Sequence, residues 1–186
     1  MNSVLRLFTG CCIAVLLLGC GRPAPAEPPP APPSAASTVQ EFFAGYRGNF
    51  REANPAFLSQ GLAAALHHGL EGEKESAARV KASDFPNDKP QILEGEVFAG
   101  LYEGFTAYEV AGERADDGST VVEVRFRNEP YNVAWTDQVV VVDENGWKID
   151  DVLYSDKKAG MLSLREVLQN FETALAAEAT TLSTAP

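Results

Sequence analysis

The sequence predicts an α+β domain in which N-terminal helices and one C-terminal helix pack on a mostly antiparallel sheet. Three observations lead to this fold class. Apolar residues recur at helical spacing near both ends of the globular part, and strand-like alternation fills much of residues 105–154. Two dipeptides within that stretch, Asp117-Gly118 and Asn145-Gly146, are typical of hairpin turns. Helices followed by a meander of hairpins are typical of the α+β class.

Two helices are predicted before the sheet, with a third and less apolar one over residues 73–82. The first begins at a capping box, formed either by Ser37 with Gln40 or by Thr38 with Glu41. Its apolar stripe has helical spacing and comprises Val39, Phe42, Phe43, Tyr46 and Phe50.

The second helix is predicted to begin at Asn54-Pro55, because asparagine is a favourable N-cap and proline fits the first helical turn. Gly69, which follows the only histidine pair His67-His68, is expected to end this helix. The apolar face of the helix comprises Leu58, Leu62, Ala65 and Leu66.

Four strands are predicted to follow. Residues 105–114 are strand-like, and residues 120–127 alternate so that one face is apolar and the other charged. The apolar face of the second strand comprises Val122, Val124 and Phe126. Residues 133–143 form the most apolar strand, so we expect it to lie centrally in the sheet.

The fourth strand, residues 147–154, departs from strict alternation. Strict alternation would put Asp151 on the same face as Trp147 and Ile149. A β-bulge at Asp150-Asp151 would reset the register and remove this conflict. The last helix is expected to be capped by Ser163 with Glu166. Its apolar stripe comprises Leu164, Val167, Leu168, Phe171 and Leu175.

This order of elements resembles the cone-shaped fold of nuclear transport factor 2 and ketosteroid isomerase, in which helices pack into a strongly bent sheet. Residues 39–168 resemble, more specifically, an uncharacterised bacterial family, domain of unknown function 3828. The matching features are Phe42-Phe43, the Leu58-to-Leu66 helix, Lys89-Pro90 leading to Glu96-Val97-Phe98, the block from Trp147 to Tyr154, and Ser163-Leu164-Arg165. The resemblance implies the cone fold but no activity, because none is established for the family.

The N-terminus resembles a bacterial lipoprotein signal. Arg6 is followed by an apolar run over residues 7–18 that is too short to span a bilayer, and Leu17-Leu18-Gly19-Cys20 has the form of a lipobox. The resemblance implies removal of residues 1–19 and lipid attachment at Cys20. In a Gram-negative host it further implies the outer membrane, facing the periplasm, since no aspartate follows the cysteine. The alternative is an ordinary signal peptide with an incidental cysteine.

The lipobox limits the chemistry of the rest of the chain. The chain has three cysteines, of which Cys11 and Cys12 would leave with the signal and Cys20 would carry lipid. Disulfides, thiolate metal sites and a cysteine nucleophile are then excluded. Loss of Arg6 would change the formal net charge from −11 to −12, which disfavours nucleic acid as a partner. Membrane attachment is therefore expected through the lipid, and no cofactor is predicted.

Residues 20–36 are expected to form a lipidated tether and residues 37–182 a single domain. Residues 21–36 contain seven of the twelve prolines, so a polyproline II spacer reaching up to about 50 Å is predicted. A docking peptide for a proline-binding domain is the alternative. The end of the chain is expected to fray from Glu178, with residues 183–186 as a disordered tail.

Asp137 is the main candidate for chemistry, because it lies between Trp135 and Val139 on one face of the most apolar strand. A carboxylate in an apolar setting would have a raised pKa and could act as a proton-transfer base. By analogy with isomerases of the cone fold, Tyr154 or Tyr131 could donate a hydrogen bond to the substrate. The alternative places Asp137 in solvent or beside basic residues on the neighbouring strand, which are Arg125 and Arg127.

Metal binding has little support in the sequence. His67-His68 are adjacent on a helix, so their side chains point about 100° apart, and a third ligand is missing. Asp150-Asp151 lack the looping ligand pattern of a calcium site. We therefore expect a non-catalytic module that binds a small-molecule ligand or an envelope protein. The alternative is a small enzyme with isomerase-like or dehydratase-like acid/base chemistry in the cone pocket.

Overall fold

The computed structural model describes residues 32–158 and 160–183. Cys20 and most of the predicted tether lie outside the described residues, so lipidation stays a prediction. Among the residues that are described, no helix combines the length and the apolar character that a membrane span requires.

Helices and strands are segregated along the chain, as the predicted fold class requires. The described part of the chain contains three α-helices and a five-stranded antiparallel sheet, which confirms the α+β class. In chain order the elements are α1 (Ala35–Gly45), the 3-10 turns η1 (Phe50–Glu52) and η2 (Pro55–Phe57), α2 (Gln60–Ala82), β1 (Ala107–Asp116), β2 (Ser119–Asn128), β3 (Val133–Asp143), β4 (Trp147–Lys158), β5 (Met161–Ser163) and α3 (Leu164–Ser183).

The strands form a meander in the order β1-β2-β3-β4-β5, so β3 lies centrally as predicted. Both predicted hairpin turns are present. Asp117 and Gly118 have φ values of 33° and 84°, and Asn145 and Gly146 have values of 59° and 123°. These positive values fit the mirror-image turns that match the twist of paired strands.

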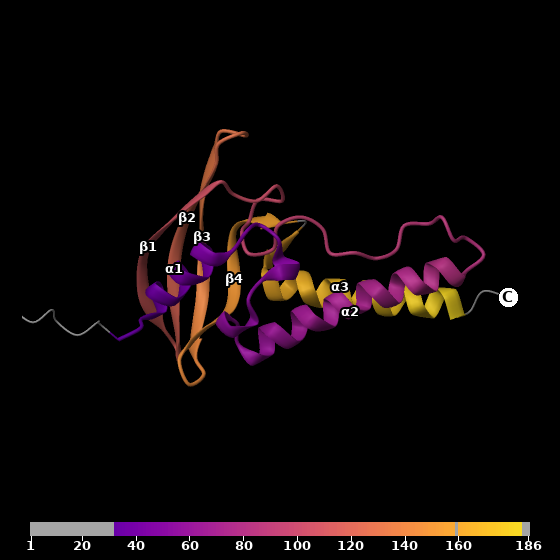
Figure 1. Cartoon of the computed structure of the whole chain (residues 1–186), viewed down its shortest axis with the longest axis horizontal. Coiled ribbons are helices and arrows are strands. Elements are labelled where there is room, and N and C mark those ends of the chain that lie inside the picture. The colour runs from indigo at the N-terminus through magenta and orange to yellow at the C-terminus, as the bar shows by residue number, and fades with distance from the viewer. Residues whose placement is uncertain (1–31, 159, 184–186) are drawn as a thin grey trace, which may run out of the picture. The chain divides into compact units, whose positions relative to one another are not determined.

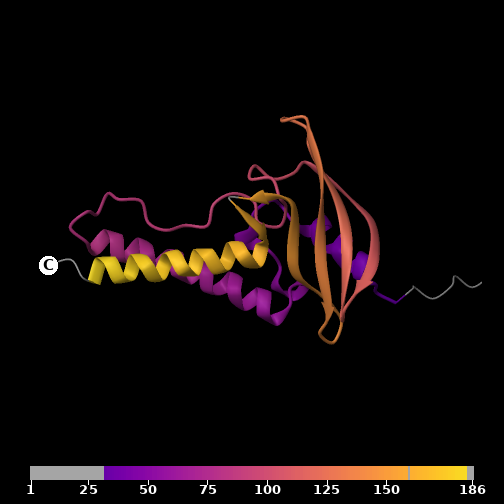
Figure 2. The same ribbon diagram turned by 180° about the vertical axis from the view of Figure 1, so that it is seen from behind.

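The core lies between the sheet and the helices. Figures 1 and 2 show α1 against the sheet, and α2 and α3 side by side. We call the sheet face that carries the buried side chains the inner face, and the opposite one the outer face. The inner face is lined by Val122, Val124, Phe126, Val139, Val141, Ile149, Val152 and Tyr154, all of them buried. On β2 this is the predicted apolar face, and the charged face is exposed.

The first helix begins earlier than the sequence predicts. Its N-cap is Ser34, whose hydroxyl accepts from the backbone N–H of Ser37, and Ser37 reaches back to the N–H of Ser34. The predicted caps at Ser37 and Thr38 are therefore wrong, because a complete capping box one turn earlier already satisfies these backbone donors. The helix ends at Gly45, and Phe50 enters the core from η1 instead.

Gly69 does not end the second helix, contrary to the prediction. Asn54-Pro55 caps only η2, and α2 begins after Ser59 and runs through the predicted third helix. A Cβ atom on Gly69 would lie 3.1 Å from Leu93 Cδ1, and one on Gly72 would lie 2.3 Å from Leu175 Cδ1. The two glycines therefore allow close packing of α2 against α3 and the following loop. This packing outweighs the helix propensity that glycine costs, about 1 kcal/mol each.

The predicted β-bulge in the fourth strand is confirmed. Val140 pairs with Asp151 and Val141 pairs with Ile149, so Asp150 is the extra residue. The shift in register brings Ile149 and Val152 onto the same inner face, where both are fully buried.

The last helix is capped as predicted, but it does not fray at Glu178. The Ser163 hydroxyl accepts from the N–H of Glu166 at 3.3 Å. The Glu178 carboxylate accepts from the Ser76 hydroxyl at 2.7 Å and from the Arg79 guanidinium at 2.8 Å. These contacts with α2 hold the end of α3, which continues to Ser183. Residues 184–186 lie outside the described residues.

We expect Ser59→Ala to lower the free energy of unfolding by about 1–2 kcal/mol. Ser59 is fully buried, its hydroxyl accepts from the N–H of Leu62, and it donates to the Asp150 carboxylate at 2.6 Å. Urea unfolding of the two proteins measures the difference. Thr173→Ala, which removes an exposed hydroxyl within α3, is the matched control and should change stability by less than about 0.5 kcal/mol. Equal stability of the Ser59 variant and wild type would contradict the cap.

Candidate functional site

The inner face of the sheet is covered by the chain's own connection between α2 and β1. We call residues 96–100 the inner segment. Val97, Phe98 and Ala99 within it are fully buried, although they belong to no helix or strand. The Phe98 ring packs at 4.9 Å from the ring of Phe42 in α1. This part of the inner face is therefore occupied by the chain's own side chains.

Buried polar side chains satisfy the backbone of the inner segment. The Glu96 carboxylate, which is 4% exposed, accepts from the N–H groups of Val97 at 2.9 Å and Phe98 at 2.7 Å. The Tyr46 hydroxyl donates to the same carboxylate at 2.7 Å. The Tyr154 hydroxyl donates to the carbonyl of Val97 at 2.7 Å. A buried loop needs such partners, because each unpaired backbone group would cost about 1–3 kcal/mol.

Asp137 lies on the inner face, as the catalytic hypothesis requires, and is only 1% exposed. It accepts from the N–H of Gly100 at 2.7 Å, the indole N–H of Trp135 at 2.8 Å and the N–H of Ser155 at 2.9 Å. The alternative, in which this residue was solvated or paired with a neighbouring arginine, is wrong. Its carboxylate instead joins β3, β4 and the inner segment, and three donors of the chain already use its oxygens.

Gly100 lies close to Asp137, and its lack of a side chain makes this approach easy. A Cβ atom at this position would lie 3.1 Å and 3.2 Å from the two carboxylate oxygens of Asp137. A side chain here would crowd the carboxylate. Glycine thus favours the close approach of backbone and carboxylate.

The two candidate tyrosines occupy different environments. Tyr154 is buried on the inner face, and its hydroxyl contacts the inner segment. Tyr131 is 59% exposed in the turn between β2 and β3. The structure therefore brings Asp137 and Tyr154 into one buried region and leaves Tyr131 outside it.

Glu96 and Tyr46 form the part of this region that the sequence analysis missed. Tyr46 was assigned to the apolar stripe of α1, and Glu96 received no role. The available signal was an isolated acid in the apolar stretch Glu96-Val97-Phe98-Ala99. A carboxylate within such a run is expected to have specific partners when it is buried.

Burial raises the pKa of Tyr46 far above its ordinary value of 10.0, and the negative charge of Glu96 adds to the rise. Burial likewise raises the pKa of Tyr154, with smaller contributions from the charges of Asp151, Asp137 and Glu96. Both hydroxyls are therefore held protonated as hydrogen-bond donors.

The two aspartates of the β-bulge connect the helices. Asp150 accepts from the Ser59 hydroxyl at the start of α2 and from the Arg165 guanidinium at the start of α3. Asp151 accepts from the backbone N–H groups of Val152 and Arg165. Burial raises the pKa of Asp151, and these hydrogen bonds oppose the rise. The pair is thus structural, and it fixes where α2 and α3 leave the sheet.

The two histidines lie on the surface of α2, as expected, but they do not end the helix. His67 and His68 line a hollow of about 360 Å³. Its acidic side chains are Glu71 and Glu75 of α2 and Glu172 of α3. Within the described ranges, no three histidine or acidic side chains are arranged to hold a metal ion. Glu71 is instead paired with Lys74 at 2.8 Å.

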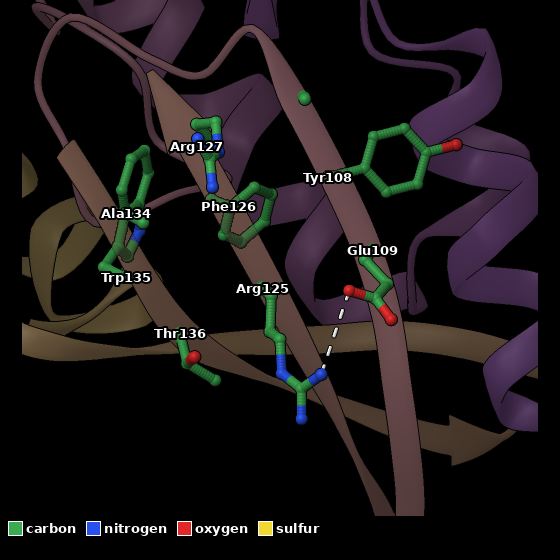
Figure 3. Close-up of a pocket in the computed structure, with 9 residues that line it drawn as sticks. Tyr108, Glu109, Arg125, Phe126, Arg127, Ala134, Trp135 and Thr136 are labelled. Atoms are coloured by element: carbon green, nitrogen blue, oxygen red, sulfur yellow. Dashed lines mark ion pairs between the residues drawn. The ribbon is translucent and has the colours of Figure 1, made fainter. Parts of the chain in front are cut away.

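A hollow of about 390 Å³ lies over β1, β2 and β3. Its polar side chains come from the outer face of the sheet. Figure 3 shows Arg125 and Arg127 on the middle strand, with Glu109 on one neighbouring strand and Thr136 on the other. Figure 2 shows the strands from this side, and no described helix lies in front of β1, β2 and β3, whereas α1 lies behind them.

Comparison of the chain with protein-family models, curated proteins and solved structures finds no match.

The buried tyrosines should make stability depend on alkaline pH. Folding raises the pKa of the Tyr46 hydroxyl, so the protonated hydroxyl stabilises the folded state fully below about pH 10. This stabilisation is lost as the pH rises further, because the tyrosine of the unfolded chain ionises first. We expect Tyr46→Phe to be less stable than wild type by about 1–2 kcal/mol at pH 8. Above about pH 10 the difference should shrink by up to about 1.4 kcal/mol per pH unit. Urea unfolding of both proteins between pH 8 and about pH 11 measures this difference in stability. A difference that does not change with pH would contradict a buried, protonated Tyr46 hydroxyl.

Proposed function

We propose that this chain is a lipid-anchored protein of the bacterial cell envelope whose domain is a non-catalytic binding module. The observation that carries the proposal is the filled inner face. The inner segment occupies the place of a pocket, and its polar groups are paired within the chain. No buried side-chain nitrogen or oxygen of the described residues lacks a hydrogen-bond partner. Hollows that could accept a ligand lie instead on exposed surfaces.

The cone-shaped fold of nuclear transport factor 2 and the family domain of unknown function 3828 remain part of this proposal. Their support is the arrangement of α1 and the inner segment against one face of a curved antiparallel sheet (Figure 2). The block from Trp147 to Tyr154 before a capped helix, on which the family resemblance depends, forms a bulged strand.

Acid/base catalysis at Asp137 has less support. A general base must reach a substrate proton with a free lone pair. Three donors of the chain occupy three of the about four lone-pair positions of the Asp137 carboxylate, and this residue is only 1% exposed. The Tyr154 hydroxyl donates to the carbonyl of Val97. Substrate would have to displace the inner segment, which contributes fully buried apolar side chains to the core.

Membrane attachment is proposed at Cys20. The support is the lipobox, together with the acidic balance of 26 acidic against 15 basic residues. Such a balance disfavours adsorption to anionic lipid, so a covalent anchor is the better means of attachment. In a Gram-negative host the anchor would place the domain at the outer membrane, facing the periplasm.

Amide hydrogen exchange tests whether the inner face stays filled. We expect the N–H groups of Val97, Phe98 and Gly100 to exchange as slowly as those of the central strand β3, because they open only on global unfolding. Asp137→Asn should speed exchange at Gly100 in particular, since an amide group presents fewer acceptors to three donors. Rapid exchange of all three in wild type would reject the filled face and favour the enzyme hypothesis.

Labelling with palmitate tests the anchor. The wild-type chain, expressed in a bacterium that processes lipoproteins, should incorporate labelled palmitate and fractionate with membranes. Cys20→Ala should abolish both, whereas the matched control Cys12→Ala should retain both, because that cysteine leaves with the signal. Incorporation of labelled palmitate into the Cys20→Ala variant would show that Cys20 is not the lipidated residue.

A further inference from the structure

Two arginine side chains without a partner at hydrogen-bond distance lie next to each other on the outer face of the sheet. Arg125 and Arg127 are two residues apart on β2, so both point to the same face, about 7 Å apart along the strand. Both side chains are exposed, and both line the 390 Å³ hollow of Figure 3. Each guanidinium carries five N–H donors in a planar fork, which suits oxyanions.

Three other arginines of the described chain use their donors internally. Arg51 bonds Glu73 at 2.6 Å, Arg79 bonds Glu178 at 2.8 Å, and Arg165 bonds Asp150. Arg125, in contrast, has its closest carboxylate oxygens at 3.8 Å, which is beyond hydrogen-bond distance.

Those two carboxylates belong to Glu109 and Glu123, and all three side chains are about half exposed or more. Exposed pairs at such distances contribute little, about 0–1 kcal/mol. For the Arg127 side chain, neither a hydrogen bond nor an ion pair is found among the described residues.

The neighbours of Arg127 leave its guanidinium open. In the sheet register it lies between Ala107 on β1 and Ala134 on β3, which are too short to cover it. Thr136, opposite Arg125, adds a hydroxyl on the same face. The other charge nearby is Glu129, which lines an adjoining hollow of about 310 Å³ with Arg127. The Arg127 guanidinium thus has no partner among the described residues, and Arg125 has only the two long ion pairs with Glu109 and Glu123.

We propose that this hollow binds the phosphate group of a phosphate-bearing ligand, with Arg125 and Arg127 as the binding residues. The inference deepens the proposed function, because it assigns a ligand class to the binding module. A tetrahedral phosphate presents several oxygens and can accept hydrogen bonds from two guanidinium groups at once. A planar carboxylate can be fully paired with one guanidinium group. The volume suits a small ligand. The phosphate can come from a soluble phosphate ester or from a lipid headgroup.

Calorimetric titration of the full chain in detergent with glycerol 3-phosphate tests the soluble source. We expect saturable binding that Arg125→Ala or Arg127→Ala weakens at least about tenfold, since each variant removes one charged fork. Arg114→Ala is the matched control, because Arg114 is exposed on β1 and paired with Asp116. It should change the affinity less than about twofold. Circular dichroism verifies that the variants fold, as expected for exposed side chains.

Vesicles distinguish the two sources. The Cys20→Ala chain, which lacks the proposed anchor, is mixed with phosphatidylcholine vesicles with and without phosphatidylglycerol. Binding that needs phosphatidylglycerol and both arginines supports a lipid headgroup, and binding of glycerol 3-phosphate alone supports a soluble ester.

Three outcomes would overturn the inference: no binding of either probe, binding unaffected by both arginine variants, or equal binding of acetate. None of these outcomes would alter the hydrogen-exchange or palmitate results. The hypothesis of a phosphate ligand can therefore fail while the hypothesis of a lipid-anchored module with a filled inner face still holds.

Discussion

The structure depends on two buried carboxylates that accept hydrogen bonds from a buried loop. Glu96 binds the N–H groups that follow it, and Asp137 reaches from β3 to the N–H of Gly100. Without these acceptors the inner segment could not lie against the sheet, because its unpaired backbone groups would prefer water. Burial of Val97, Phe98 and Ala99, and with it closure of the inner face, follows from this pairing.

A second constraint places the helices relative to the sheet. The bulge at Asp150 turns both bulge aspartates toward helix starts, where they meet Ser59 and Arg165. Close packing at Gly69 and Gly72 then keeps α2 and α3 together beyond the sheet. The buried side chains described here therefore contact other parts of the chain, and the surfaces that could bind a partner lie on the outside of the domain.

The sequence predicted much of the fold where local patterns decide the outcome. Alternation located β2 and β3, Asn145-Gly146 and Asp117-Gly118 located the turns, and the conflict at Asp151 revealed the bulge. The predicted helix ends were wrong where tertiary packing competes with local sequence preference. Gly69 is typical of a helix end, yet α2 passes through it, and there the glycine packs closely against Leu93 and α3. For the candidate site, the sequence singled out Asp137 but left open whether it faces inward, and it did not reveal the partners of its carboxylate.

By itself, the sequence determined the fold class, the order of the strands and the central position of β3, because these follow from side-chain periodicity and turn residues close in the chain. It also supplied the lipobox on which the proposed anchor rests. Tertiary structure alone decided that the inner face is filled and that Arg125 and Arg127 have no carboxylate at hydrogen-bond distance among the described residues. These features depend on contacts between residues such as Gly100 and Asp137, which are 37 positions apart. No local pattern encodes such contacts, since they form only when distant segments pack.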